Sequence, residues 1–277
     1  MTKCVALWCL CAAAAPAADW KSGFLKTSDG VRLHYLEAGR GQAIVFQPGW
    51  TMPAEIWEPQ IRGLAARYHV VALDPRAQGA SEKTPEGLYA ERRAADIKDA
   101  VDALHLAPAV LVGWSLGVPE VLTYVGRFGT STVKAVVLVD GPLGSDAGPT
   151  RQGWAWMRQM QKDRVRFAGE FVRGMYRKPQ PEEYLRRITA ASLLTPTNSA
   201  VALMANMVME GDWRSLLSKL DRPVLYAGTA RMKVHAETLR KAVPAARVEI
   251  FEDCGHALFV DGAPRFNTVL ERFLGAK

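Results

Sequence analysis

Cysteine is almost absent from this chain outside its first eleven residues. Three of the four cysteines, Cys4, Cys9 and Cys11, lie in that opening segment, and Cys254 stands alone in the rest. Once the opening segment is removed, no disulfide can form within the chain, because the bond needs two cysteines. A disulfide-stapled fold is therefore excluded. A chain of 277 residues, 49% of them hydrophobic, is long enough to bury a sizeable core instead.

The sequence also lacks the patterns of metal and nucleic-acid binding. The histidines lie far apart, without the paired spacing of zinc ligands, at His34, His69, His105, His235 and His256. The formal net charge is +7, but the basic residues are scattered and acidic residues lie between several of them. We interpret them as a solvated surface, and we expect neither a metal site nor a nucleic-acid partner.

The first eighteen residues form a segment distinct from the rest. Lys3 gives a short positive start, an apolar run covers residues 4–15, and Ala15-Pro16-Ala17 offers a cleavage site of small residues. This order is typical of a secretory signal peptide, cleaved after Ala17 or Ala18. A buried N-terminal helix is the alternative. A permanent membrane span would need about 20 apolar residues, so we expect an exported bacterial protein, periplasmic or secreted, with no stable span after cleavage.

Apolar runs alternate with helical stretches through most of the chain. Residues 23–27 and 31–38 alternate apolar and polar around Ser28-Asp29-Gly30, which predicts an antiparallel hairpin. Strands separated by helices form right-handed crossovers and a parallel sheet. The predicted fold class is therefore α/β, a mostly parallel sheet flanked by helices. Buried strands are expected at residues 43–46, 70–73, 109–113, 133–139, 223–228 and 247–251, and helices at 56–67, 89–104, 118–128, 235–242 and 264–274.

Residues 143–220 interrupt this alternation. No buried-strand run occurs there, and large apolar residues such as Trp154, Trp156 and Met157 recur at near-helical spacing, which predicts an inserted helical segment. The expected organisation is thus a signal peptide over residues 1–18, the first part of an α/β core over 19–142, the helical insertion over 143–220, and the second part of the core over 221–277.

The stretch Gly113-Trp114-Ser115-Leu116-Gly117 lies between a predicted strand and a predicted helix. Gly-x-Ser-x-Gly in that context is the pattern of a nucleophile elbow, a tight turn that directs the serine hydroxyl outward from the carboxyl end of a parallel sheet. The glycines leave room for the helix to pack. The five-residue pattern also arises by chance, but here both flanking elements accompany it. Ser115 is therefore a candidate nucleophile, and the N–H of Leu116 points the same way.

Three further motifs accompany the elbow: Gln47-Pro48-Gly49-Trp50, the loop Asp74-Pro75-Arg76-Ala77-Gln78-Gly79-Ala80-Ser81, and Asp253-Cys254-Gly255-His256. Together they resemble the α/β-hydrolase family, in its capped branch of serine esterases and lipases. The resemblance covers nearly all of the chain after the leader and implies the α/β-hydrolase fold, with residues 143–220 as a helical cap. We interpret Asp74, Arg76 and Ser81 as structural groups that hold their loop by charge-assisted hydrogen bonds.

The resemblance implies a catalytic role for each of these motifs. Ser115 would be the nucleophile and His256 the general base, because a serine hydroxyl needs an adjacent base to attack at neutral pH. The N–H groups of Trp50 and Leu116 would form the oxyanion hole. The family often has His-Gly where this chain has Pro48-Gly49, a departure that removes a polar side chain and leaves the backbone donor.

The acidic member of the triad is missing from its usual position. In most relatives it follows the seventh strand, where this chain reads Gly228-Thr229-Ala230-Arg231-Met232-Lys233. Some branches place the acid after the sixth strand, which implies that Asp140 orients the imidazole here. The alternative is that Asp140 only caps a turn. Asp253 and Glu237 are the other candidates for the acid.

The resemblance implies a carboxylesterase-like serine hydrolase (EC 3.1.1.-) that forms an acyl-enzyme on a small to medium ester and needs no cofactor. The Trp- and Met-rich cap favours an apolar or aromatic substrate. Trp114, Trp154 and Met207 are the candidate substrate contacts, and packing within the protein is their alternative role. Because fold and triad do not fix the substrate, the same triad could cleave a lactone, a thioester, an amide or a C–C bond. A non-catalytic ligand-binding relative is the alternative from a different class.

Overall fold

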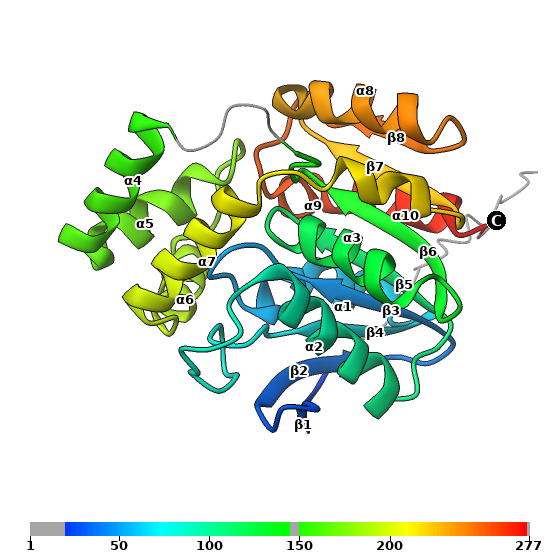
Figure 1. Cartoon of the computed structure of the whole chain (residues 1–277), viewed down its shortest axis with the longest axis horizontal. Coiled ribbons are helices and arrows are strands. Elements are labelled where there is room, and N and C mark those ends of the chain that lie inside the picture. Colours follow the sequence, from blue (N-terminus) through cyan, green and yellow to red (C-terminus); the bar gives the residue numbers. More distant parts are fainter. Residues whose placement is uncertain (1–19, 145–149, 276–277) are drawn as a thin grey trace, which may run out of the picture.

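The computed structural model describes residues 20–144 and 150–275. Within these ranges, eight strands form one sheet in the order β1-β2-β4-β3-β5-β6-β7-β8 (Figure 1). The expected signal peptide, residues 1–18, lies outside the described residues. The strands are β1 Lys21–Lys26, β2 Arg32–Ala38, β3 Gln42–Gln47, β4 Tyr68–Leu73, β5 Ala109–Trp114, β6 Val133–Val139, β7 Val224–Gly228 and β8 Arg247–Ile250.

The sheet is mostly parallel because helices connect its central strands. Strands β3 to β8 pair in parallel, whereas β2 runs antiparallel to both β1 and β4. Every residue of β5 is buried, and in β6 only Lys134 is exposed. Continuous apolar strands of this kind are stable only when both faces of the sheet are covered.

Helices cover both faces of the sheet and divide the core in two. Alternate residues of β5 belong to opposite clusters: Val110 and Val112 pack towards α1, α9 and α10, whereas Leu111 packs towards α2, α3 and α8. This alternation is the period-two geometry of a strand. The helices are α1 Glu58–Leu64, α2 Ala90–Ala103, α3 Gly117–Phe128, α8 Lys233–Ala242, α9 Leu258–Asp261 and α10 Ala263–Phe273, with 3₁₀ segments η1 Ala54–Trp57, η2 Arg214–Lys219 and η3 Ala230–Met232.

Between β6 and β7 the described residues form four α-helices: α4 Arg151–Lys162, α5 Arg164–Gly174, α6 Glu182–Leu193 and α7 Thr197–Glu210. Figure 1 shows them grouped to one side of the sheet, as the sequence predicts for a cap. Apolar side chains of α4, α5 and α7, among them Met160, Phe167 and Leu203, form a third cluster with Trp50 and Leu116 of the core. The cap is therefore anchored on the two segments that the sequence assigns to an oxyanion hole.

The predicted elements agree closely with the observed ones, apart from the ends of several elements and the short helical segments. The helix expected over residues 56–67 begins instead as η1 and ends at Leu64, because the chain turns there to enter β4. The four-residue α9 was not predicted, since one helical turn leaves no periodic pattern. Within the described ranges no single helix is long and apolar enough to cross a membrane, while α6 and α7 together meet that test only across an 85° bend.

Candidate active site

Ser115 occupies the turn between β5 and α3. Its φ of +54° lies in the left-handed region, which residues with a side chain adopt only under strain. The Ser115 N–H donates to the carbonyl of Val139 over 3.0 Å, which fixes the turn against β6. The glycines are required by space, because a Cβ at Gly113 would lie 2.2 Å from the Gly117 carbonyl oxygen, and one at Gly117 would lie 2.5 Å from that of Gln47. The turn thus leaves Ser115 half-buried at the carboxyl end of the sheet.

Asp140 and His256 are in direct contact. Asp140 Oδ2 lies 2.8 Å from His256 Nδ1, and the other carboxylate oxygen accepts the backbone N–H of Thr229 over 2.6 Å. The Asp140 side chain is only 3% exposed and that of His256 is 29% exposed. A carboxylate can only accept, so Nδ1 carries the proton and a neutral ring has its lone pair on Nε2. Of the carboxylates that the sequence left as candidates, Asp140 is the one that meets His256.

The loop that carries His256 is held by hydrogen bonds from three directions. Trp114 Nε1 donates to the His256 carbonyl over 3.0 Å. The Gly255 N–H donates to Asp261 over 2.7 Å, and the Ala257 N–H donates to the Met175 carbonyl over 3.0 Å. These contacts come from the elbow strand, from α9 and from the end of α5. They fix the imidazole relative to both the nucleophile and the cap.

Two neutral side chains flank Asp140. Burial, reinforced by the Asp140 charge, raises the pKa of Tyr226, and its hydroxyl donates to the Gly141 carbonyl over 3.0 Å. Burial lowers the pKa of His235, with Asp140 opposing the shift, and His235 Nδ1 accepts the Leu143 N–H over 3.4 Å. Both groups are therefore uncharged at neutral pH, which leaves the carboxylate to interact with His256.

The loop after β3 lies against the nucleophile. A Cβ at Gly49 would lie 2.9 Å from Ser115 Cβ and 3.4 Å from its Oγ, so only glycine allows this approach. The loop closes as a turn in which the Met52 N–H donates to the Gly49 carbonyl over 3.2 Å, with Thr51 at a φ of +58°. The peptide that ends in the Trp50 N–H therefore lies beside Ser115. Leu116, the other expected donor, is the N-cap residue of α3.

The two tryptophans next to these motifs are buried and differ in their surroundings. The Trp114 ring packs in the core against Trp57, Phe259 and the His256 ring, whose centroid lies 5.0 Å away. The structure thus favours the packing alternative for Trp114 over a contact with substrate. The Trp50 ring points to the cap, where it meets Trp156 at 5.1 Å between centroids and donates to the Ala200 carbonyl over 2.8 Å.

The other expected substrate contacts, Trp154 and Met207, lie on the cap. Trp154 is 44% exposed and lines an apolar cavity of about 120 Å³ together with Trp156, Met157, Met204 and Val208. Met207 is half-buried and lines a narrow gap beside Leu116. The two side chains therefore line different cavities. Of these two cavities, the one at Trp154 is large enough for a ligand group.

A larger cavity, of about 470 Å³, opens beside Asp140 and His256. Its wall is formed by the loop after β7, by the segment that carries Cys254 and Gly255, and by Tyr176 and Arg177 at the end of α5. The loop after β7 carries no carboxylate. It contributes the backbone N–H of Thr229 instead, which donates to Asp140. This donor has no signature in the sequence, because any residue but proline could supply it.

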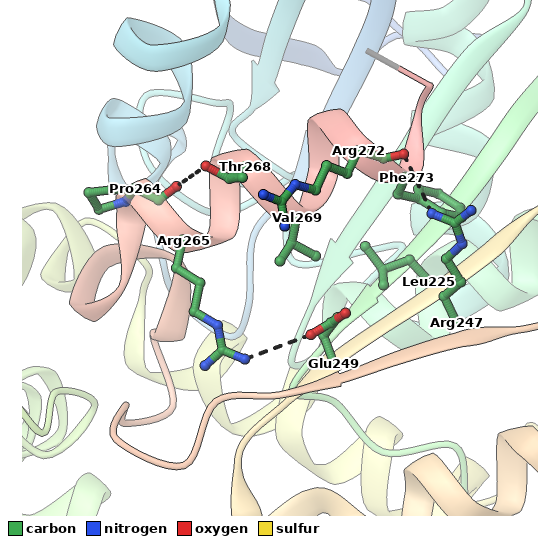
Figure 2. A pocket seen from close by; sticks show the side chains of 9 residues that line it. All are labelled: Leu225, Arg247, Glu249, Pro264, Arg265, Thr268, Val269, Arg272 and Phe273. Carbon is green, nitrogen blue, oxygen red and sulfur yellow. Dashed lines mark hydrogen bonds and ion pairs between the residues drawn. The ribbon is translucent and has the colours of Figure 1, made fainter. Parts of the chain in front are cut away.

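A cavity of similar size lies away from these residues, between β8 and α10. Figure 2 shows Arg265 of α10 reaching towards Glu249 of β8, and Arg247 reaching towards the Arg272 carbonyl. The Arg265 to Glu249 distance is 3.7 Å and the Arg247 bond is 3.4 Å long. None of the candidate catalytic residues reaches this groove, which has a volume of about 440 Å³.

The loop after β4 is structural, as the sequence indicates. Asp74 accepts the N–H groups of Ala54 and Ala80 over 2.5 and 2.7 Å. Ser81 Oγ donates to the Asp74 carbonyl over 2.6 Å, and Arg76 pairs with Asp96 over 2.6 Å. Within residues 20–144 and 150–275, no group of three or more His, Cys, Asp or Glu side chains could hold a metal ion.

Known proteins share this architecture over most of the chain. The pimeloyl-[acyl-carrier protein] methyl ester esterase of Aliivibrio salmonicida is 26% identical over 262 residues, 87% of this chain and 95% of that protein. The non-heme haloperoxidase of Rhodococcus erythropolis is 37% identical, but over 42% of this chain and 43% of its own. The structure of an esterase from Exiguobacterium antarcticum superposes with a TM-score of 0.82 at 23% identity, covering 91% of this chain and 98% of that one.

The family profile described as the alpha/beta hydrolase family matches residues 44–268, a range that contains the elbow, Asp140 and His256. The profile covers most of the chain. The chain therefore belongs to the alpha/beta hydrolase family.

Proposed function

We propose that this protein is a serine hydrolase of carboxylic esters that works through an acyl-enzyme. The contact between Asp140 and His256 carries the proposal, because it orients an imidazole at the edge of the sheet where Ser115 lies in its strained turn. Nucleophile, base and orienting acid are the three parts that acyl transfer by serine requires. The esterases among the relatives support the same reaction class.

In the first half of the reaction, Ser115 Oγ attacks the ester carbonyl carbon and its proton passes to His256 Nε2. The carbonyl oxygen becomes an oxyanion and accepts the N–H groups of Trp50 and Leu116. Asp140 stabilises the imidazolium that forms. The C–O bond to the alcohol then breaks, and the proton on His256 moves to the leaving oxygen, so that the alcohol departs neutral and the acyl group stays on Ser115.

In the second half, His256 takes a proton from water, and the resulting hydroxide attacks the acyl carbon. The bond to Ser115 Oγ breaks, and His256 returns the proton to the serine. The products are the carboxylic acid and the free enzyme. No cofactor takes part, because every proton and electron pair is supplied by the substrate, by water or by these side chains.

An apolar or aromatic acyl group fits the cap best. The cavity at Trp154, with Trp156 and Met204 in its wall, is lined almost wholly by apolar side chains. Trp156, in the wall of this cavity, also contacts the Trp50 ring, and Trp50 follows Gly49, which lies against Ser115. We therefore place the acyl chain in the cavity at Trp154, on the far side of Trp156 from Trp50.

Turnover of p-nitrophenyl esters of increasing acyl length tests the proposal. We expect hydrolysis of the short and medium esters, and loss of it in Ser115→Ala and His256→Ala. A panel of a lactone, a thioester and an anilide then separates ester cleavage from the other reactions open to the same triad. Binding of an ester without any turnover would instead support a non-catalytic, ligand-binding protein.

We further propose that residues 1–18 act as a signal peptide that exports the protein. The positive start, apolar run and small-residue site in the sequence support this. N-terminal sequencing of the protein after expression in a bacterium tests it. A mature chain that begins at Ala18 or Asp19 is the expected result, and a chain that keeps Met1 in the cytoplasm contradicts it.

A further inference from the structure

Gln78 lies in the loop after β4 and has no exposed surface. Its side-chain Nε2 donates to two backbone carbonyls of the loop after β3: Gly49 over 3.0 Å and Met52 over 2.9 Å. Both hydrogens of one amide are therefore committed to the turn that lies against Ser115. The sequence indicates a structural loop at residues 74–81 but gives no sign that one of its side chains reaches the nucleophile's surroundings.

The contact to Gly49 sets the direction of the neighbouring donor. In a trans peptide the C=O of one residue and the N–H of the next point in opposite directions. When Gln78 and the Met52 N–H hold the Gly49 carbonyl on one side, the Trp50 N–H points to the other. The Ser115 side chain lies against Gly49. The orientation of the Trp50 N–H therefore depends on the two bonds that hold the Gly49 carbonyl, one of which comes from Gln78.

The orientation of the Gln78 amide is itself determined. Arg93 Nη2 donates to Gln78 Oε1 over 3.1 Å, and because a guanidinium can only donate, the amide NH₂ must face the loop. Arg93 in turn is paired with the buried Glu120 of α3, which also accepts Gln47 Nε2 over 2.5 Å. This buried chain of contacts ties the end of β3, the start of α3 and the turn at Gly49 into one unit.

The backbone around Gln78 has little freedom. Ala77 has a φ of +64° and Gly79 has a φ of +48°. A Cβ at Gly79 would lie 2.1 Å from the Asp74 carboxylate, so the loop closes tightly around that group. We infer that this close packing holds the Gln78 side chain rigidly in place. This rigidity is what a preorganised oxyanion hole requires.

We propose that Gln78 is a positioning residue for the oxyanion hole: it orients the Gly49–Trp50 peptide so that the Trp50 N–H meets the charge that develops on the substrate carbonyl. The proposal rests on the proposed ester hydrolysis. Since the oxyanion exists only in the transition state and the intermediate, loss of Gln78 should lower kcat and leave KM nearly unchanged.

The test compares Gln78→Glu with wild type. Glutamate has the same shape and keeps an acceptor for Arg93, but its carboxylate cannot donate to Gly49 and Met52. We expect kcat to fall about 10- to 100-fold, by analogy with the loss of an oxyanion donor, while KM stays within about threefold. The affinity for an alkyl boronic acid, which mimics the tetrahedral intermediate, should fall by the same factor as kcat/KM, whereas product carboxylate should bind as before.

Gln42→Glu is the matched control. Gln42 Nε2 likewise donates to two backbone carbonyls, those of Ala43 and Pro108, but at the opposite end of β3. It should leave both kcat and boronate affinity unchanged. If Gln78→Glu does not fold, Gln78→Met replaces it in the test, because methionine removes the same donor without adding a charge. The expected changes in kcat and boronate affinity are the same.

The outcomes separate the two proposals. A wild-type protein that hydrolyses no ester and binds no boronate overturns the proposed function and this inference together. An active wild type with unchanged kcat and boronate affinity in Gln78→Glu overturns the role of Gln78 and leaves the ester hydrolysis standing. An equal loss of affinity for substrate, product and boronate would show that Gln78 acts only through the general stability of the protein. That result would also overturn its role as a positioning residue.

Discussion

The backbone N–H of Thr229 donates a 2.6 Å hydrogen bond to Asp140. Thr229 follows β7, the position at which the family resemblance leads us to expect a carboxylate, and here that position supplies an N–H donor to Asp140, directly after β6. A carboxylate that accepts both this N–H and the imidazole has its two oxygens fixed in direction. The Asp140 carboxylate is therefore held in a fixed direction towards His256.

Replacement of Asp140 by Asn should disable the imidazole. The amide can present an N–H to Nδ1 and stabilise the wrong tautomer, so we expect turnover to fall on the order of 10³- to 10⁴-fold. Steady-state kinetics with a p-nitrophenyl ester measure the loss, and circular dichroism verifies the fold. Asp253→Asn is the control, because Asp253 is exposed and pairs with Lys178 on the surface. Full activity in Asp140→Asn would show that Asp140 has only a structural role.

Gly49→Ala should reduce activity through crowding. The new methyl group would lie 2.9 Å from Ser115 Cβ and 3.2 Å from the Trp114 ring, so the loop or the nucleophile must move. We expect kcat to fall at least about 10-fold, since small displacements of reacting groups are costly. The measurement is kcat for a short ester together with the rate of Ser115 labelling.

The matched control for Gly49→Ala is Gly169→Ala on α5. A Cβ there meets nothing within 4 Å and the residue is helical, so alanine should stabilise the fold by up to about 1 kcal/mol without changing kcat. A wild-type kcat in Gly49→Ala would show that the close approach of this loop to Ser115 does not affect catalysis.

Trp154→Ala should change substrate preference rather than chemistry. Removal of the indole widens the apolar cavity of the cap and takes away a contact surface. We expect KM for aromatic or long acyl esters to rise about 3- to 10-fold, which corresponds to about 1 kcal/mol of lost apolar contact, with kcat for acetate esters unchanged. Val165→Ala, a change at an exposed position on α5, is the control. Identical KM values across the ester series would place the acyl chain elsewhere.

Cys254 should stay unreactive in the folded protein at neutral pH. The residue is 5% exposed, and burial, with the nearby Asp253 charge, raises the pKa of its thiol to about 11. The raised pKa favours the protonated, unreactive form, and thiolate appears only as the pH approaches that value. Mass spectrometry of the peptide that contains Cys254 after iodoacetamide treatment at pH 8 should show little alkylation. Complete alkylation in urea serves as the positive control, and rapid alkylation of the native protein would contradict the burial.

Much of this fold could be predicted because its signals are local. The apolar run 133–139 coincides with β6. The alternation of apolar strands with periodic helices predicts, from the sequence alone, an α/β fold with a mostly parallel sheet. The elbow glycines could be recognised for the same reason, because their role is steric and the pattern that reveals it spans only five residues. Pairing of Asp140 with His256 spans 116 residues and could be inferred only through the family resemblance and the empty position after β7.

Other parts of the site could not be predicted, because backbone groups or side-chain directions determine them. Thr229 acts through its N–H, which leaves no trace in residue identity. Gln78 reaches the Gly49 carbonyl because Arg93 turns its amide, a contact among three separate segments. Trp114 was a candidate substrate contact by its place beside Ser115, but alternate strand residues face opposite sides, and its side chain enters the core.

Mass spectrometry after reaction with a fluorophosphonate tests the central claim most directly, since this reagent forms a covalent bond only with an activated serine. We predict a single adduct that maps to Ser115, forms in competition with a short ester and is lost in Ser115→Ala and greatly slowed in Asp140→Asn. A folded protein that remains unlabelled at Ser115, or that is labelled at another serine while it hydrolyses esters, would contradict the account.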